Sequence, residues 1–145
     1  MGAVAGFLAA LPDGRVIGPF SLALQSPEIG AAFARLQSTE ESSTTLSPRI
    51  RQIVILTVGS IWKSNYELYA HKTVAQKAEI AQQAIDALAN GTDPRSLEEE
   101  ELLAWQLVRQ IAVDHRVSEE RQPGYRRPGF SCRLLLHCLL SAEYF

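Results

Sequence analysis

Residues 46–75 read LSPRIRQIVILTVGSIWKSNYELYAHKTVA, and this stretch decides the fold that we expect. It opens with Ser47 and Pro48, a helix cap followed by the residue favoured at the first helical position. Residues 50–58 are dense in Ile, Val and Leu, and their β-branched content would also suit a buried strand. The length of the run, its cap and the helical patterns around it favour a buried helix. Gly59 and Ser60 then either end this helix or allow another helix to approach it closely.

A second helix start lies within the same stretch. Ser64 and Glu67 fit the S-x-x-E capping box that marks a helix N-terminus. Beyond it, apolar residues recur at steps of three and four, the stripe of an amphipathic helix: Val74, Ala78, Ala81, Ile85 and Leu88. We expect either one helix or two with a short break near residues 78–81, and a stop at Asn90 and Gly91.

Two further helices are predicted on either side. Ser26 and Pro27 repeat the cap signature and predict a helix to about Gln37, buried through Ile29, Phe33 and Leu36, before a polar loop over residues 38–45. Residues 96–99, SLEE, form another capping box and predict a helix to about His115, buried on Leu102, Trp105, Val108 and Ala112. The helix dipole favours the four acids at 98–101 in the first turns, and we expect them to form a solvent-exposed helix start.

These patterns predict an all-α fold in a single domain over residues 1–145. Residues 1–25 form a loop-rich arm, with turns predicted at Pro12-Asp13-Gly14 and Gly18-Pro19. Residues 116–145 are a divergent tail that holds five arginines in its first 18 positions and breaks the regular patterning. Two interpretations of this tail stay open: a frame-altered or truncated segment, or a divergent segment that docks through residues 134–140.

Composition excludes several classes of function. The chain has 145 residues with 14 Lys+Arg and 16 Asp+Glu, and it lacks the basic stripe of a nucleic-acid-binding protein. No run of apolar residues is long enough for a transmembrane helix, and apolar residues 1–11 lack the basic flank of a secretory signal. We therefore expect a cytoplasmic protein that binds neither nucleic acid nor membrane. Cys132 and Cys138 match no common zinc or redox spacing, and no phosphate-binding loop occurs, so we expect no metal and no cofactor.

The candidate site lies in the first helix turns after Ser64. In a helix Ser64, Glu67 and His71 share one face, beside an aromatic edge formed by Trp62, Tyr66 and Tyr69. An imidazole that titrates near neutral pH, next to a carboxylate that orients it, is suited to proton transfer. The structural alternative is that Glu67 serves only the capping box, that His71 is an i+4 partner of Glu67, and that Trp62 and Tyr66 are core.

The remaining histidines are weaker candidates. His115 is expected at a helix C-terminus, where the dipole favours its charge. His137 lies beside Cys138 in the divergent tail, where a Cys-His nucleophile would need a stable pocket.

Over residues 18–120 the sequence resembles the carboxymuconolactone decarboxylase family, which includes the alkylhydroperoxidase-type proteins. The resemblance is carried by Gly18-Pro19-Phe20, by Ser26-Pro27-Glu28, by residues 46–52 (LSPRIRQ), by residues 66–72 (YELYAHK) and by the helix pattern of residues 75–91. It implies an alkylhydroperoxidase-like helical bundle that forms homo-oligomers, from dimers to hexamers.

Within this family, the resemblance separates two branches. In the peroxidase branch a Cys-x-x-Cys pair precedes the histidine, and these positions fall on Ser64 and Glu67. The glutamate that the branch carries one helix earlier falls on Gln52. Because thiolate chemistry needs a sulfur nucleophile, peroxidase activity through this site is not expected, although the protein would still carry a peroxiredoxin-like family label.

The decarboxylase-like branch lacks the cysteines and uses no cofactor. It implies loss of carbon dioxide from a small carboxylated γ-lactone and protonation of the resulting dienolate. His71 would donate or shuttle the proton with Glu67 as its orienting partner, and Arg51 or Lys63 would hold the substrate carboxylate or the lactone oxygen. Trp62, Ser64 and Tyr66 complete the predicted substrate-binding set.

Two other hypotheses stay open at this stage. One is a thiol-dependent peroxidase or antioxidant protein whose cysteines have moved to Cys132 and Cys138. The other is a non-catalytic helical oligomer whose aromatic face serves assembly or small-molecule binding.

Overall fold

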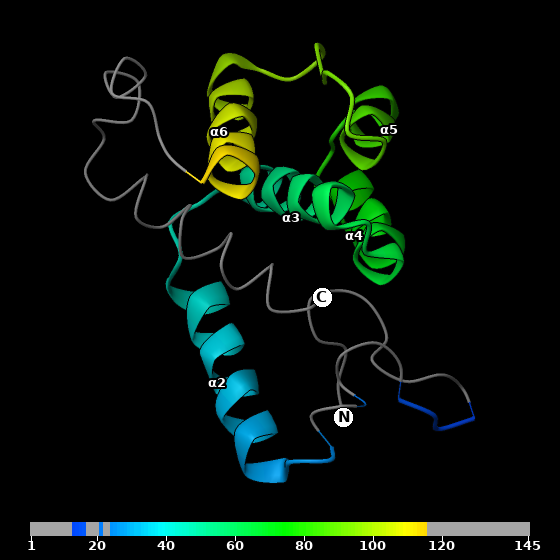
Figure 1. The fold of residues 1–145 in the computed structure, drawn as a ribbon, viewed down its shortest axis with the longest axis vertical. Helices are drawn as coiled ribbons and strands as arrows, with labels where there is room; N and C mark the ends of the chain where they lie inside the picture. Colours follow the sequence, from blue (N-terminus) through cyan, green and yellow to red (C-terminus); the bar gives the residue numbers. More distant parts are fainter. Residues whose placement is uncertain (1–12, 17–20, 22–23, 116–145) are drawn as a thin grey trace. The chain divides into compact units, whose positions relative to one another are not determined.

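The computed structural model describes residues 13–16, 21 and 24–115 of the chain, and its elements in these ranges are helices (Figure 1). The all-α prediction is confirmed for this part of the protein. No helix among the same residues is long and apolar enough to span a bilayer. The chain divides into two compact units, residues 1–44 and 45–145.

The first unit contains α2, Pro27–Ser43. Its start at Ser26 and Pro27 is as predicted, but the expected loop after Gln37 is wrong, because the helix continues through Ser43. Residues 38–43 are polar and contain neither Gly nor Pro, so nothing in them ends a helix. The expected buried stripe is also wrong: α2 has no buried residue, and Ile29 is 72% exposed. Periodicity identifies the apolar face of a helix but not whether a partner covers it.

The second unit is organised around α3, Pro48–Trp62, which contacts α4, α5 and α6 (Figure 1). Ser47 caps the helix by accepting a hydrogen bond from the Ile50 backbone N–H at 3.2 Å, and Pro48 occupies the first turn. Nine residues of α3 between Ile50 and Gly59 are buried, so the predicted buried helix is confirmed. A helix apolar around most of its circumference needs neighbours on several sides, and α3 has them.

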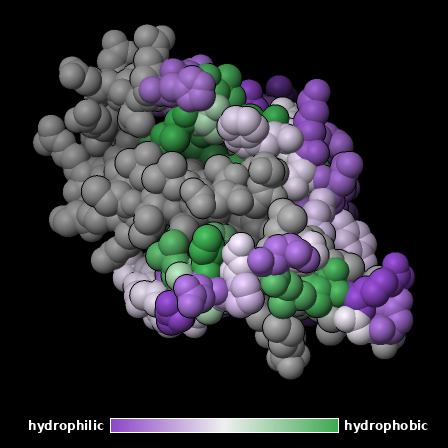
Figure 2. Space-filling model, turned by 60° about the horizontal axis from the view of Figure 1, so that its bottom comes forward, coloured by the Kyte–Doolittle hydropathy of each residue, from purple (hydrophilic) through white to green (hydrophobic). Residues whose placement is uncertain are grey.

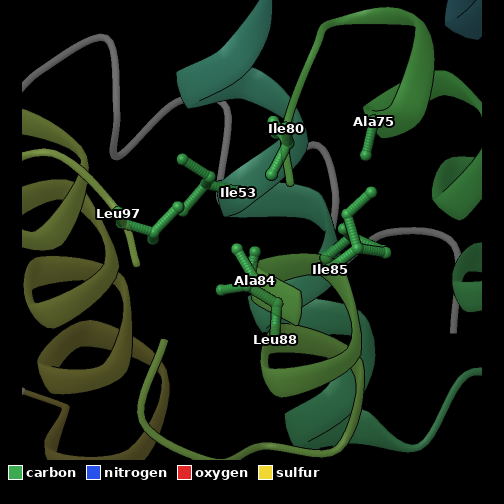
Figure 3. Close-up of a cluster of buried hydrophobic side chains, with 8 residues drawn as sticks. Ile53, Ala75, Ile80, Ala84, Ile85, Leu88 and Leu97 are labelled. Carbon is green, nitrogen blue, oxygen red and sulfur yellow. The ribbon is translucent and has the colours of Figure 1, made fainter. Parts of the chain in front are cut away.

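One face of α3 packs on α6, Glu99–Arg109. This cluster joins Leu46 to three α3 positions spaced four apart and to three α6 residues: Ile50, Val54, Val58, Ala104, Leu107 and Val108. The opposite cluster joins α3 to α4, Asn65–Lys77, and α5, Gln82–Ala89. It contains Ile53, Leu56, Ala75, Ile80, Ala84, Ile85, Leu88 and Leu97, most of which are labelled in Figure 3.

The helix boundaries follow most of the local signals. α4 ends at Lys77 and α5 begins at Gln82, so of the two expected arrangements the structure has two helices with a break near residues 78–81. α5 ends at Ala89, with Asn90 as its cap and Gly91 at a φ of +69°, as the predicted stop requires. A short π-helix η1, Gln110–Asp114, extends α6, and His115 ends it in the left-handed conformation at a φ of 53°.

The start of α6 differs from the prediction. Glu98, not Ser96, is the N-cap, and Glu98 and Glu101 form the reciprocal capping box. The expectation of a fully solvated acidic start is wrong for Glu101, which is only 5% exposed. Burial is the largest single influence and favours the neutral form of this carboxyl. The hydrogen bonds from Arg49 and from the Glu98 backbone, together with the charge of Arg49, outweigh burial and lower the pKa of Glu101. The predicted face of α6 is confirmed at Val108, which is buried, while Leu102 and Trp105 are only partly buried against the core. Ala104 and Leu107 are buried although they were not part of that face.

The surface of the described residues mixes hydrophilic and hydrophobic side chains, as Figure 2 shows for one face. The large apolar side chains that remain exposed are Leu24, Ile29, Leu36, Trp62, Tyr69 and Val113.

Candidate functional site

A tight corner between α3 and α4 positions the candidate site. Lys63 ends α3 in the left-handed conformation at a φ of 58°, and the Ser64 backbone N–H donates to the Gly59 carbonyl at 2.9 Å. Ser64 then caps α4, where its hydroxyl accepts from the Glu67 backbone N–H at 3.4 Å. The two helices therefore meet after only two linking residues.

Gly59 faces α4 at this corner. A Cβ atom placed on Gly59 would lie 3.4 Å from the Glu67 Cβ and 3.4 Å from the Leu68 Cδ2. Gly59 thus lies inside α3 and allows the close approach of a neighbouring helix, which confirms the second of the two expectations for it. Gln52 lies two turns before Gly59 on the same side of α3.

Gln52, Glu67 and His71 form a buried polar group at this contact. The Gln52 Oε1 lies 2.8 Å from the His71 Nδ1, and the His71 Nε2 lies 3.3 Å from the Glu67 Oε2. Glu67 is 4% exposed, and Gln52 and His71 are each 7% exposed. A buried imidazole therefore has an amide on one ring nitrogen and a carboxyl group on the other.

Burial governs the protonation of this group. Desolvation raises the pKa of Glu67 from 4.5 to about 7, because the charged carboxylate loses its hydration inside the protein. Burial also raises the pKa of Tyr66, and the charge of Glu67 adds to that effect. A carboxyl group that changes charge near neutral pH is suited to general acid and base chemistry.

The structure places the remaining predicted residues at different depths. Arg51 in α3 and Ser64 and Tyr66 at the start of α4 are half-buried, whereas Lys63 is exposed. Trp62 is 55% exposed and Tyr69 is 76% exposed, so these two rings of the expected aromatic edge are not buried beside Glu67 and His71 within one chain. Tyr66 is the ring whose ionisation responds to Glu67.

Several other candidates do not join the group. His115 lies at a helix end as predicted, as the residue that ends η1, and it is exposed. Cys132, Cys138 and His137 lie outside the described residues, as do Gly18 and Pro19 of the resemblance. Among the described residues, no three His, Cys, Asp or Glu side chains gather where they could hold a metal ion.

A surface hollow lies on α5 and the loop that follows it. Its polar lining side chains are exposed, and they include Asp86, Asp93 and Arg95. The Arg95 Nε and the Asp93 Oδ2 pair at 3.4 Å on this surface. The hollow holds no buried polar group, and we assign no site to it.

One long-range contact was missed by sequence reasoning. Arg49 forms a two-pronged ion pair with Glu101, at 2.5 Å from its Nε and 3.2 Å from its Nη2. The Arg49 Nη1 also donates to the Glu79 carbonyl at 2.6 Å. No local pattern joins residues that lie 52 positions apart, so only the fold reveals this contact.

Comparisons of the chain with protein-family models, with curated proteins and with solved structures find no match.

Proposed function

We propose that the protein is a cofactor-independent enzyme of the carboxymuconolactone decarboxylase type, which transfers a proton through the Glu67–His71 pair. The observation that carries the proposal is the buried contact between the Glu67 Oε2 and the His71 Nε2 at 3.3 Å. Its support is that a desolvated carboxyl group with a pKa of about 7 stands beside an imidazole, so either group can hold the proton near neutral pH.

The proposed substrate is a small carboxylated lactone or a related ring. In the proposed reaction the bond from the ring carbon to the carboxylate breaks and carbon dioxide leaves. The electron pair of that bond passes into a dienolate, and a proton from the Glu67–His71 pair completes the new C–H bond. Solvent returns one proton to the pair. Arg51, half-buried in α3, is proposed to hold the substrate carboxylate or to stabilise the dienolate oxygen, with Lys63 as the exposed alternative.

We extend this proposal to an alkylhydroperoxidase-like arrangement of the helices, to assembly of the chain with copies of itself, and to a cytoplasmic location. Assembly has support from the exposed Trp62 and Tyr69 rings, since large exposed apolar side chains favour association.

The test is a screen of carboxylated lactones by ultraviolet absorbance, with His71→Ala as the critical variant. We expect His71→Ala to lower turnover by about 10²- to 10⁴-fold, the usual contribution of a general acid or base. His115→Ala is the matched control, because His115 is exposed at the end of η1, and it should retain full activity. Equal turnover by the two variants would rule out His71 as the proton carrier.

A second candidate function is a non-catalytic helical oligomer. The observation that favours it is that Glu67 and His71 are almost fully buried while Trp62 and Tyr69 face outward. Under this hypothesis Trp62→Ala with Tyr69→Ala lowers the mass measured by analytical ultracentrifugation, and no lactone is turned over by the unsubstituted protein.

A further inference from the structure

Gln52 contacts the side of His71 that faces away from Glu67. Its Oε1 lies 2.8 Å from the His71 Nδ1, and the two residues come from different helices, 19 positions apart in the chain. Both side chains are 7% exposed, so bulk water does not readily replace either partner. A hydrogen bond between two buried groups fixes the orientation of both.

The chemistry of the amide oxygen determines which way this hydrogen bond runs. A carbonyl oxygen only accepts hydrogen bonds, so the His71 Nδ1 must carry the hydrogen and donate it. A neutral imidazole carries a hydrogen on one nitrogen, and the other nitrogen then has a free lone pair. In the neutral ring this lone pair is on Nε2, the atom that lies 3.3 Å from the Glu67 Oε2.

We propose that Gln52 is a positioning residue, whose side-chain oxygen holds the Nδ1 hydrogen of His71 so that Nε2 exchanges a proton with Glu67. In one form the Glu67 hydroxyl donates to the bare Nε2. In the other form the proton has moved to Nε2, and an imidazolium donates to the Glu67 carboxylate while Nδ1 still donates to Gln52. One O–H bond is broken and one N–H bond is formed, and the total charge of the group is unchanged.

This assignment explains why an amide can serve at position 52. Gln52 accepts the same hydrogen bond in both forms, so the ring need not turn when the proton moves. A group that stays in place during proton transfer avoids the cost of reorganisation. The consequence of Gln52 for turnover rests on the proposed function, whereas the protonation of Nδ1 does not.

The test is ¹⁵N NMR of the imidazole in tag-free protein at near-neutral pH. The chain has three histidines, so His115→Gln with His137→Gln leaves His71 as the only one. We expect the Nδ1 signal at the shift of a protonated nitrogen. An Nδ1 signal at the shift of an unprotonated nitrogen, with the hydrogen on Nε2, overturns the proposal, and this measurement needs no substitution at position 52.

Two variants in that background test the role of the oxygen. Gln52→Leu removes the acceptor and should move hydrogen from Nδ1 to Nε2. Gln52→Glu keeps an oxygen at the same reach and should preserve the Nδ1 hydrogen. Circular dichroism shows whether each variant is folded. An unchanged Nδ1 signal in folded Gln52→Leu, or its loss in folded Gln52→Glu, contradicts the positioning role.

Activity is measured separately on the variants with all three histidines present. Gln52→Leu should lower turnover of the lactone by up to about 100-fold, the cost of a small misplacement of a reacting group, while KM changes little. Gln52→Glu should restore much of it. A protonated Nδ1 in a protein that turns over no lactone defeats the proposed function and leaves the inference standing. An unprotonated Nδ1 in an active protein does the reverse.

Discussion

Arg49 at the start of α3 and Glu101 in the first turn of α6 are joined by two parallel contacts, although 52 positions separate them in the chain. The Arg49 side chain is 33% exposed and the Glu101 side chain is 6% exposed. Arg49 also binds the Glu79 carbonyl in the turn between α4 and α5. One guanidinium thus connects the beginnings of two helices to the turn between two others.

Arg49→Met should destabilise the protein, because it leaves the buried Glu101 carboxylate without its partner. We expect a loss of about 2 to 3 kcal/mol in the free energy of unfolding, below the usual cost of breaking a fully buried pair because Arg49 is partly exposed. Urea denaturation measures this change. The double variant Arg49→Met/Glu101→Gln should lose less than Arg49→Met alone, and a larger loss in the double variant would contradict this account.

Glu67 should make the stability of the protein depend on pH. Its pKa is raised from 4.5 to about 7 by burial, so an unfolded chain gives up this proton at lower pH than the folded chain does. The folded state therefore binds more protons, and stability falls as pH rises from about 4.5 to 7, by on the order of 3 kcal/mol.

Glu67→Gln tests that pH dependence, because the amide does not ionise. We expect the variant to gain stability relative to the unsubstituted protein as pH rises through this window, measured by denaturation at several pH values. Glu99→Gln, at an exposed position of α6, is the matched control and should keep the original pH dependence. Identical pH profiles for Glu67→Gln and the unsubstituted protein would show that Glu67 is not the source.

A small and a large side chain at position 59 should change the stability of the protein in opposite directions. Gly59→Ala places a Cβ at ordinary contact distance from the Glu67 Cβ and improves helix propensity, so we expect a gain of up to about 1 kcal/mol in unfolding free energy. Gly59→Leu adds atoms where α4 already lies and should cost about 1 to 3 kcal/mol. Thermal denaturation of both variants measures the contrast, and a stable Gly59→Leu protein would argue against a close contact between α3 and α4.

Replacement of both cysteines distinguishes the proposed chemistry from thiol chemistry. The group of Gln52, Glu67 and His71 contains no sulfur, so Cys132→Ser with Cys138→Ser should leave lactone turnover unchanged. Peroxide consumption that disappears in this double variant would instead support the thiol-dependent hypothesis. Both assays are run on the same preparation.

The sequence predicted those elements whose signals lie within a few neighbouring residues. The cap at Ser47, the break after Lys77 and the stop at Asn90 each depend on local hydrogen bonds and backbone preferences. The start of α6 was misplaced because Ser96 and Glu98 both offer an oxygen that can cap a helix, and the buried pairing of Glu101 with Arg49 accompanies the second choice. Such pairing is a tertiary effect that no local window contains.

In the candidate site too, the sequence predicts what local spacing determines and not what depends on the packing of the helices. The spacing of Glu67 and His71 predicts that they share a face of one helix, and they lie in contact there. Spacing gives neither their depth of burial nor the hydrogen bond to Gln52, since both depend on how α3 packs against α4. The sequence also does not predict the exposure of Trp62 and Tyr69, because an aromatic ring suits a core and a surface contact equally.

The division of the chain at Thr44 and Thr45 has a consequence for any spectroscopic study of unfolding. Both tryptophans, Trp62 and Trp105, belong to the second unit, whereas α2 belongs to the first. Indole fluorescence therefore follows the melting of the second unit alone, while far-ultraviolet dichroism follows the helices of both. Coincident transitions by the two probes would mean that the units unfold as one cooperative system, and separate transitions would mean that each has a melting curve of its own.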